Sequence, residues 1–107
     1  MEVFEHSKAF PADERFSLTD QFRRCTRSVA ANISEAWRKR RYVAAFASKL
    51  NDAETEAAEA QTWVELARRC GYLGDPIARV LDARYEELLA QLSTMIRDAD
   101  RWCTKAV

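Results

Sequence analysis

Residues 43–70, VAAFASKLNDAETEAAEAQTWVELARRC, carry an apolar residue at every third or fourth position without interruption. The repeated positions are Val43, Phe46, Leu50, Ala53, Ala57, Ala60, Val64 and Ala67. Alternating spacings of three and four are typical of a helix that packs along one seam against a neighbouring helix. The stretch therefore predicts one long helix of about 43 Å, at about 1.5 Å per residue. The small alanines at its centre predict a close approach of the partner helix.

Downstream, the segment CGYLGDP at residues 70–76 predicts the end of this helix and the start of the next. Gly71 suits the position just after a helix, and Asp75 followed by Pro76 is typical of an N-cap and a first helical residue. The last helix is expected to show a broad apolar face. That face comprises Ile77, Val80, Leu81, Tyr85, Leu88, Leu89, Leu92, Met95, Ile96 and Ala99.

Upstream, the boundary of the long helix is less sharply marked, because AWRKRRYVAAF at residues 36–46 has neither Gly nor Pro. The apolar register permits one continuous helix over 15–70, about 84 Å long. Such a length is improbable in a globular chain of this size, so we expect a turn at 37–41. A second break is expected at Phe10–Pro11, with Asp13, Ser17 or Thr19 capping the following helix.

Composition agrees with a single helical-bundle domain spanning 1–107. Only two Gly and two Pro occur among the 107 residues, which favours an all-α fold. No stretch approaches the roughly 20 apolar residues of a membrane span, and no signal peptide is recognisable, so we expect a cytoplasmic protein without membrane contact. The three cysteines have no metal-ligand spacing, and we expect reduced thiols, with Cys25 and Cys70 serving as small apolar core residues.

On a helix over 18–36, one face is apolar and a narrower polar stripe runs beside it. The apolar face comprises Leu18, Phe22, Cys25, Val29, Ile33 and Ala36. The polar stripe comprises Gln21, Arg24, Ser28, Asn32 and Glu35. A polar stripe beside a core face commonly contacts a neighbouring helix or subunit and sets its register; ligand contact and solvated surface are the alternatives.

Charge is unevenly spread along a chain that is neutral overall. Residues 1–50 carry a net +4, and the window 15–49 carries +7. Its cations are candidate phosphate contacts for RNA or another nucleic acid: Arg23, Arg24, Arg27, Arg38, Lys39, Arg40 and Arg41. The alternative is a structural or protein-interaction scaffold, in which these cations are solvated or pair with the acidic second half of a neighbouring copy.

Catalytic residue sets are missing from the sequence. The one histidine, His6, lies near the chain end, and no Glu-x-x-His pair, GxGxxG or P-loop occurs. Asp52, Glu56 and Glu59 share a helical face that we interpret as solvated. We therefore expect no enzymatic activity, no cofactor and no metal.

A family resemblance covers most of residues 10–73. It is carried by Phe10-Pro11, Glu14-Arg15, Leu18-Thr19, Gln21, Arg23-Arg24, Ser28, Asn32-Ile33, Glu35 and Gly71-Tyr72-Leu73. In these residues the chain resembles the 23S rRNA intervening-sequence protein family, also called four-helix-bundle proteins, which includes the accessory variability determinants of diversity-generating retroelements.

The resemblance implies an antiparallel four-helix bundle that assembles as a homopentamer, without enzymatic activity. It also implies nucleic-acid binding through the basic residues named above, and a subunit interface formed by the polar stripe. A reverse transcriptase is an expected partner only within the retroelement branch, which the zero net charge disfavours. Only nine residues precede Phe10, so the first helix is expected to be short, which would weaken the fourth wall of the bundle or leave it to a neighbour.

Overall fold

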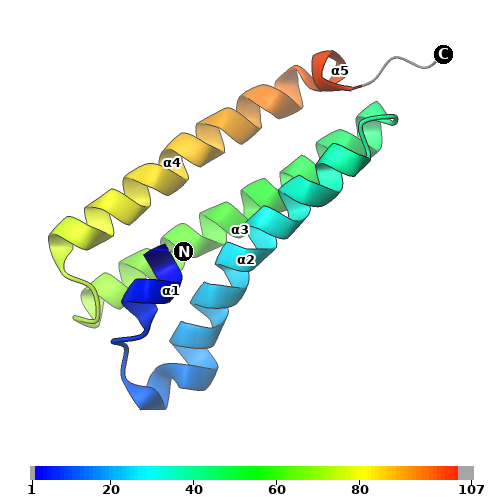
Figure 1. Cartoon of the computed structure of the whole chain (residues 1–107). Coiled ribbons are helices and arrows are strands. Elements are labelled where there is room, and N and C mark those ends of the chain that lie inside the picture. Colours follow the sequence, from blue (N-terminus) through cyan, green and yellow to red (C-terminus); the bar gives the residue numbers. More distant parts are fainter. Residues whose placement is uncertain (1, 104–107) are drawn as a thin grey trace.

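Every regular element of the structure, a computed structural model that describes residues 2–103 except the side chains of Arg15 and Phe16, is helical. The elements are α1 (Glu2–Ser7), η1 (Ala12–Glu14), η2 (Arg15–Thr19), α2 (Asp20–Arg38), α3 (Val43–Arg69), α4 (Asp75–Arg97) and α5 (Ala99–Trp102). Helices α2, α3 and α4 are long and lie side by side in a body of 53 × 24 × 17 Å (Figure 1). The predicted all-α class and bundle arrangement are confirmed.

A tight turn over residues 39–42 reverses the chain between α2 and α3. The Lys39 amide donates to the Ala36 carbonyl over 2.9 Å, and Tyr42 is extended. The turn lies within two residues of the predicted one, and the alternative of a single helix over 15–70 is wrong. Folding back is favourable because Ala36 and Phe46, on either side of the turn, become completely buried in one core cluster.

The alanine seam of α3 packs against the apolar face of α2, more extensively than any other pair of elements. All the predicted seam residues are buried except Val43, which is the first residue of α3 and extends beyond the packed region. On α2, Phe22, Cys25, Val29 and Ala36 are buried as predicted, and Ile33 is half-buried. The heptad pattern thus identified both the helix and the surface that it buries.

Between α3 and α4, Gly71 has a φ of +77°, a conformation that strains any residue with a Cβ. The Tyr72 amide donates to the Ala67 carbonyl over 2.9 Å and closes the helix end. The predicted N-cap at Asp75 is wrong by one residue: Gly74 occupies the cap, and Asp75 begins α4.

The buried line of α4 differs from the predicted broad face. It is formed by Ala78, Leu81, Tyr85 and Leu92. Ile77 and Val80, which were predicted to be in the core, are 37% and 49% exposed. The reason is that α4 packs chiefly on α3, so that Ile77 and Val80 lie outside this contact and stay at the surface.

The short α1 packs against α2, toward the end of the bundle that holds the loop between α3 and α4 (Figure 1). Val3 is buried, and Glu2 forms an ion pair with Arg84 of α4. The chain breaks after α1 as predicted, where the Phe10 ring lies 5.6 Å from that of Tyr72. The predicted side-chain cap is not made: α2 is entered through η1 and η2, and Thr19 forms no capping bond. At the opposite end, α1 contributes nothing to the core.

Replacing Ala57 by Leu is expected to destabilise the fold, because the side chain at this position is fully buried in the seam between α2 and α3. Overpacking of this kind typically costs about 1–3 kcal/mol, which lowers the Tm of a domain of this size by at least about 5 °C. Thermal unfolding followed by circular dichroism measures the effect. The matched control is Ala58→Leu, on the exposed side of the same helix turn. Equal Tm values for the two variants would show that α2 and α3 can move apart to accommodate a leucine without loss of stability.

Candidate nucleic-acid interface

The seven predicted nucleic-acid-binding cations do not form one patch. Arg23, Arg24 and Arg27 lie in the first half of α2, whereas the other four lie at its end and in the turn that follows. Fifteen residues separate Arg23 from Arg38, which corresponds to about 22 Å along the helix. We call residues 38–41 the turn cations. The structure therefore divides the predicted site into two groups with different surroundings.

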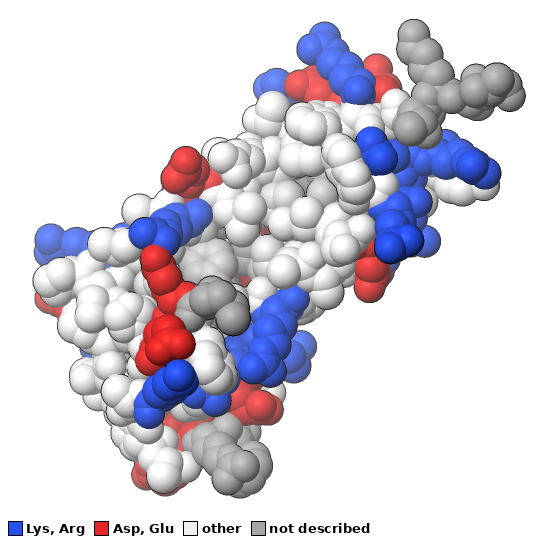
Figure 2. All heavy atoms as spheres, in the orientation of Figure 1, with Lys and Arg blue, Asp and Glu red and all other residues white. Residues whose placement is uncertain are grey.

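The turn cations gather at one end of the molecule, where Figure 2 shows a concentration of basic side chains beside a largely uncharged face. Within residues 2–103, Arg38, Lys39 and Arg41 form no ion pair, and all three are exposed. An open pocket of about 750 Å³ lies next to them. It is lined by Ile33, Ser34, Trp37, Arg38, Arg40 and Arg41. The positive charge of Arg38 and Arg41, which pair with no carboxylate of residues 2–103, is thus presented beside a hollow.

Two tryptophans that sequence reasoning missed accompany the turn cations. The Trp37 ring lies 6.4 Å from the Trp102 ring in an edge-to-face arrangement, which joins the end of α2 to α5. The Arg40 guanidinium carbon lies 3.7 Å from the centre of the Trp37 ring, and its Nε donates to the Trp37 carbonyl over 3.0 Å. The position of Trp37 between the core residue Ala36 and the cations was a usable signal. Nothing in the sequence indicated Trp102, because its contact forms only on folding.

The cations in the first half of α2 are held by neighbouring groups. Arg23 donates from Nε to the Ser7 hydroxyl over 2.7 Å, and its guanidinium lies 4.6 Å from the centre of the Phe4 ring. The Arg27 guanidinium lies 5.9 Å from the same ring centre. These contacts attach α1 to α2. Arg23 and Arg27 therefore have a structural role in the fold that the sequence did not predict.

The polar stripe of α2 lies along α3 of the same chain. Arg24 Nη2 is 3.7 Å from Glu59 Oε1, and Lys49 Nζ is 2.8 Å from Glu35 Oε2. Lys49 holds the pKa of the Glu35 carboxyl below its usual value. Arg24 precedes Glu35 on α2, whereas its partner Glu59 follows Lys49 on α3. The two helices therefore run antiparallel, and these pairs fix their register.

The rest of the stripe bonds locally. Gln21 accepts hydrogen bonds from the Arg24 guanidinium, and Asn32 donates to the Ser28 hydroxyl over 3.2 Å. The predicted contact with a neighbouring helix is thus made within the chain. The subunit interface that the resemblance implied for these residues stays a prediction.

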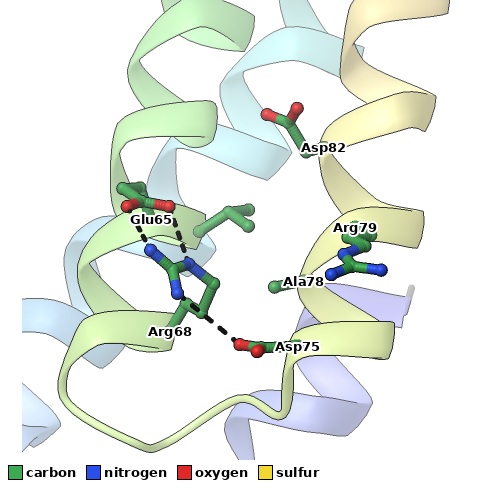
Figure 3. A pocket seen from close by; sticks show the side chains of 7 residues that line it. Glu65, Arg68, Asp75, Ala78, Arg79 and Asp82 are labelled. Atoms are coloured by element: carbon green, nitrogen blue, oxygen red, sulfur yellow. Dashed lines mark hydrogen bonds and ion pairs between the residues drawn. The ribbon is translucent and has the colours of Figure 1, made fainter.

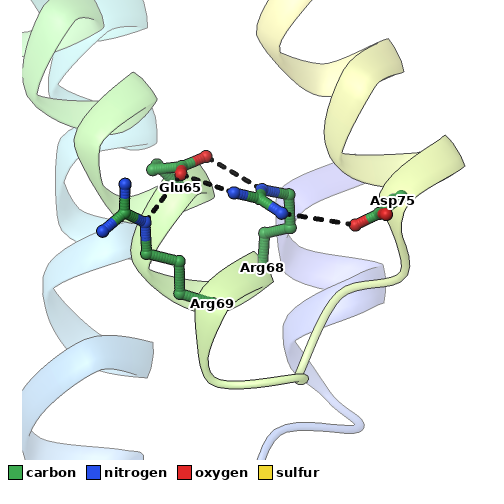
Figure 4. Close-up of polar contacts among 4 residues, drawn as sticks. All are labelled: Glu65, Arg68, Arg69 and Asp75. Carbon is green, nitrogen blue, oxygen red and sulfur yellow. Dashed lines mark hydrogen bonds and ion pairs between the residues drawn. The ribbon is translucent and has the colours of Figure 1, made fainter.

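A second hollow, of about 250 Å³, lies between α3 and α4 near their connecting loop (Figure 3). Arg68 makes a two-point bond to Glu65, at 2.7 and 3.0 Å, and its Nη1 lies 3.5 Å from Asp75 (Figure 4). Arg69 also donates to Glu65 over 2.8 Å. The hydrogen bond from Arg68, which is the larger cause, and the hydrogen bond from Arg69 lower the pKa of the Glu65 carboxyl to about 2. Since carboxylates already neutralise these guanidinium groups, this hollow is a less suitable anion site than the pocket beside the turn.

The acidic face of α3 is only partly solvated, contrary to our prediction. Asp52 is exposed, but one oxygen of Glu56 is buried without a hydrogen-bond partner. Glu56 and Glu59 each place an oxygen within 4.8 Å of the Cys25 sulfur. Cys25, Glu56 and Glu59 could together bind a cation. However, Arg24 already pairs with Glu59, so the negative charge of Glu59 is in part compensated within the protein.

The three cysteines form no disulfide with one another, and they differ in exposure. Cys25 is fully buried, whereas Cys70, predicted to be a core residue, is exposed because it directly follows the last turn of α3. Burial, with the nearby Glu59 carboxylate as the second cause, raises the pKa of the Cys25 thiol to about 11.

The fold and the site together define this protein as a small helical bundle with a cationic and aromatic end. The chain belongs to the family of 23S rRNA-intervening sequence proteins, whose sequence model matches residues 1–94. No curated protein sequence matches it at a significant level. Among the helices of residues 2–103, none combines the length and apolarity needed to cross a membrane.

A solved structure supports the same assignment. The crystal structure of a protein of unknown function from the S23 ribosomal protein family of Bacteroides thetaiotaomicron has a TM-score of 0.80 to this chain, with 28% sequence identity. The similarity covers 89% of this chain and 88% of that one. The described fold is therefore shared over nearly the whole length of both proteins.

Native alkylation is expected to label Cys70 rapidly and to spare Cys25. At pH 8 a thiol with a pKa of about 11 is about one part in a thousand thiolate, against about a quarter for an unperturbed thiol. Iodoacetamide labelling followed by peptide mass spectrometry measures both sites in one sample. The same reaction in denaturant is the control, where both cysteines should react alike. Rapid labelling of native Cys25 would contradict its burial.

Proposed function

We propose that this protein is a non-enzymatic, homo-oligomeric bundle that binds RNA or another nucleic acid through the turn cations. The observation that carries the proposal is the exposure of Arg38, Lys39 and Arg41 without any ion pair inside residues 2–103. Every phosphate that such a cation contacts releases condensed counterions, and this release drives binding without dependence on sequence. By contrast, Arg24 and Arg68 are paired with carboxylates.

The rest of the predicted basic surface takes a secondary part in this proposal. The contacts that attach Arg23 and Arg27 to α1 are with Phe4 and Ser7, which are uncharged and so do not compensate the positive charge of the two arginines. Their charge therefore adds to the field along α2 without being needed for direct contact.

Self-association strengthens the proposal, because four cations on one subunit give only modest affinity. In a closed ring each copy repeats the turn cations around the axis, which multiplies phosphate contacts. The short α1 supports assembly: it covers one end of the bundle and leaves the flank of α4, with Ile77 and Val80, exposed. A homopentamer is the state that the family resemblance implies, with the polar stripe of α2 at its interface.

Replacing Arg38 and Arg41 together by Gln is expected to weaken binding to all nucleic-acid sequences and to flatten its salt dependence. Each lost phosphate contact lowers the slope of log K against log salt by about 0.7–0.9, so the two substitutions should reduce it by about 1.5 per subunit engaged. Fluorescence anisotropy of a labelled structured RNA, titrated at roughly 50–200 mM salt, measures both quantities.

The matched control is Arg69→Gln with Arg79→Gln, which removes the same charge at the opposite end of the bundle and should leave the slope unchanged. A slope that falls equally in both double variants would place the contacts elsewhere. Failure of the folded wild-type oligomer to bind at the lowest salt would overturn the proposal and favour a protein-interaction scaffold.

Replacing Asn32 by Leu is expected to change the mass of the assembly, because Asn32 lies in the polar stripe that is proposed to set subunit register. Light scattering coupled to size-exclusion chromatography measures the mass, and thermal unfolding is recorded alongside. The control is Ala30→Leu, at an exposed position of the same helix outside the stripe. An unchanged mass and Tm for Asn32→Leu would remove the stripe from the interface.

A further inference from the structure

We propose that the ligand of the turn end is a nucleic-acid segment with unpaired bases, which stack on Trp37 and Trp102 while the turn cations hold its phosphates. This inference rests on the proposed function and adds to it the kind of nucleic acid that is bound. It is carried by the aromatic and cationic groups that the fold brings together at the α2–α5 end.

The exposure of the two tryptophans is the first step. Trp37 is 47% exposed and Trp102 is 42% exposed, although each carries a large apolar ring. Leaving such rings in water forgoes the favourable free energy that burying their apolar surface would give. The rings are nevertheless held in place, since they contact each other at 6.4 Å across two helices. A fixed and half-exposed aromatic pair is a surface ready to accept a flat ligand.

The second step is the position of charge relative to these rings. Arg40 lies over Trp37 at 3.7 Å, and the same pocket is lined by Arg38 and Arg41. The guanidinium and the indole thus form one stacked cationic and aromatic group beside Arg38 and Arg41. Aromatic rings among cations that track a backbone are the common arrangement of proteins that bind single strands. Ser34, at the pocket wall, adds a hydroxyl that donates or accepts hydrogen bonds.

The third step separates unpaired from paired nucleic acid. Inside an A-form duplex the bases stack on one another, and their faces are closed to protein side chains. A duplex offers phosphates to Arg38 and Arg41 but no base face to Trp37. An exposed aromatic pair therefore has no use in binding a duplex, whereas loops, bulges and single strands present the faces that it needs.

The test compares three labelled probes of about 15 nucleotides or base pairs: oligouridylate, an abasic oligonucleotide of equal length, and duplex RNA. Anisotropy gives the affinity of the wild-type protein for each, and tryptophan emission is recorded in the same titration. We expect oligouridylate to bind at least about 5-fold more tightly than the abasic probe, because base stacking adds to phosphate contact. We also expect it alone to quench the emission.

The variants assign that difference to the two rings. Trp37→Ala with Trp102→Ala is expected to lose between about 5-fold and 100-fold in affinity for oligouridylate and to keep its affinity for the abasic probe. Tyr42→Ala is the matched control, since Tyr42 is a 64% exposed aromatic at the same turn that is not part of the Trp37–Trp102 ring pair. A second variant, Trp37→Phe, keeps an aromatic ring between α2 and α5 and therefore preserves the fold of this end. Its affinity for oligouridylate should lie between those of the wild type and the double variant.

The outcomes distinguish the two proposals. Equal affinity for oligouridylate and the abasic probe, without quenching, would overturn base stacking and leave phosphate binding by the turn cations intact. Tighter binding of duplex than of oligouridylate would do the same. No binding of any probe by the folded protein at low salt would overturn nucleic-acid binding itself, and with it this inference.

Discussion

The close packing of α2 on the alanine seam of α3 is the constraint on which the rest of the structure depends. Ala53, Ala57 and Ala60 have no exposed surface, because the facing helix lies directly on them. This contact brings the polar stripe of α2 against Glu59 and Lys49 of α3, so that ion pairs form along the edge of the seam. It also forces the chain to reverse sharply at the end of α2, which is where four consecutive cations stand.

The distribution of ion pairs explains how a neutral chain presents a positive surface. Carboxylates of α3 and α4 neutralise arginines along the helices, as Glu59 does for Arg24 and Glu65 for Arg68. The turn has no acidic residue of its own between Glu35 and Asp52, and Glu35 pairs with Lys49. Local imbalance of charge follows from geometry, because an ion pair needs a partner on a facing helix turn, and Arg38, Lys39 and Arg41 meet no such carboxylate within residues 2–103.

The short α1 gives the bundle two unlike ends. At one end, Phe4 and Phe10 attach α1 and the following segment to the body, and Arg23 and Arg27 are used in that attachment. At the other end, α5 closes the core with Ala99 and leaves two tryptophans at the surface. Proposed self-association and proposed ligand binding therefore draw on different parts of one molecule: the flank of α4 and the polar stripe of α2 for the first, and the turn cations with the two tryptophans for the second.

The sequence by itself determined the helical class, the seam of α3, the buried face of α2 and the breaks at Phe10–Pro11 and Gly71, because these depend on spacing and on local backbone chemistry. The exact turn, the exposure of Ile77 and Val80, and the exposure of Cys70 depended on which surfaces other elements cover. Likewise, only the tertiary structure divided the seven predicted cations into paired, attached and turn groups and brought Trp102 to Trp37. Periodicity reports on one helix at a time, whereas a site made from facing helices is settled by how closely and at what register they pack.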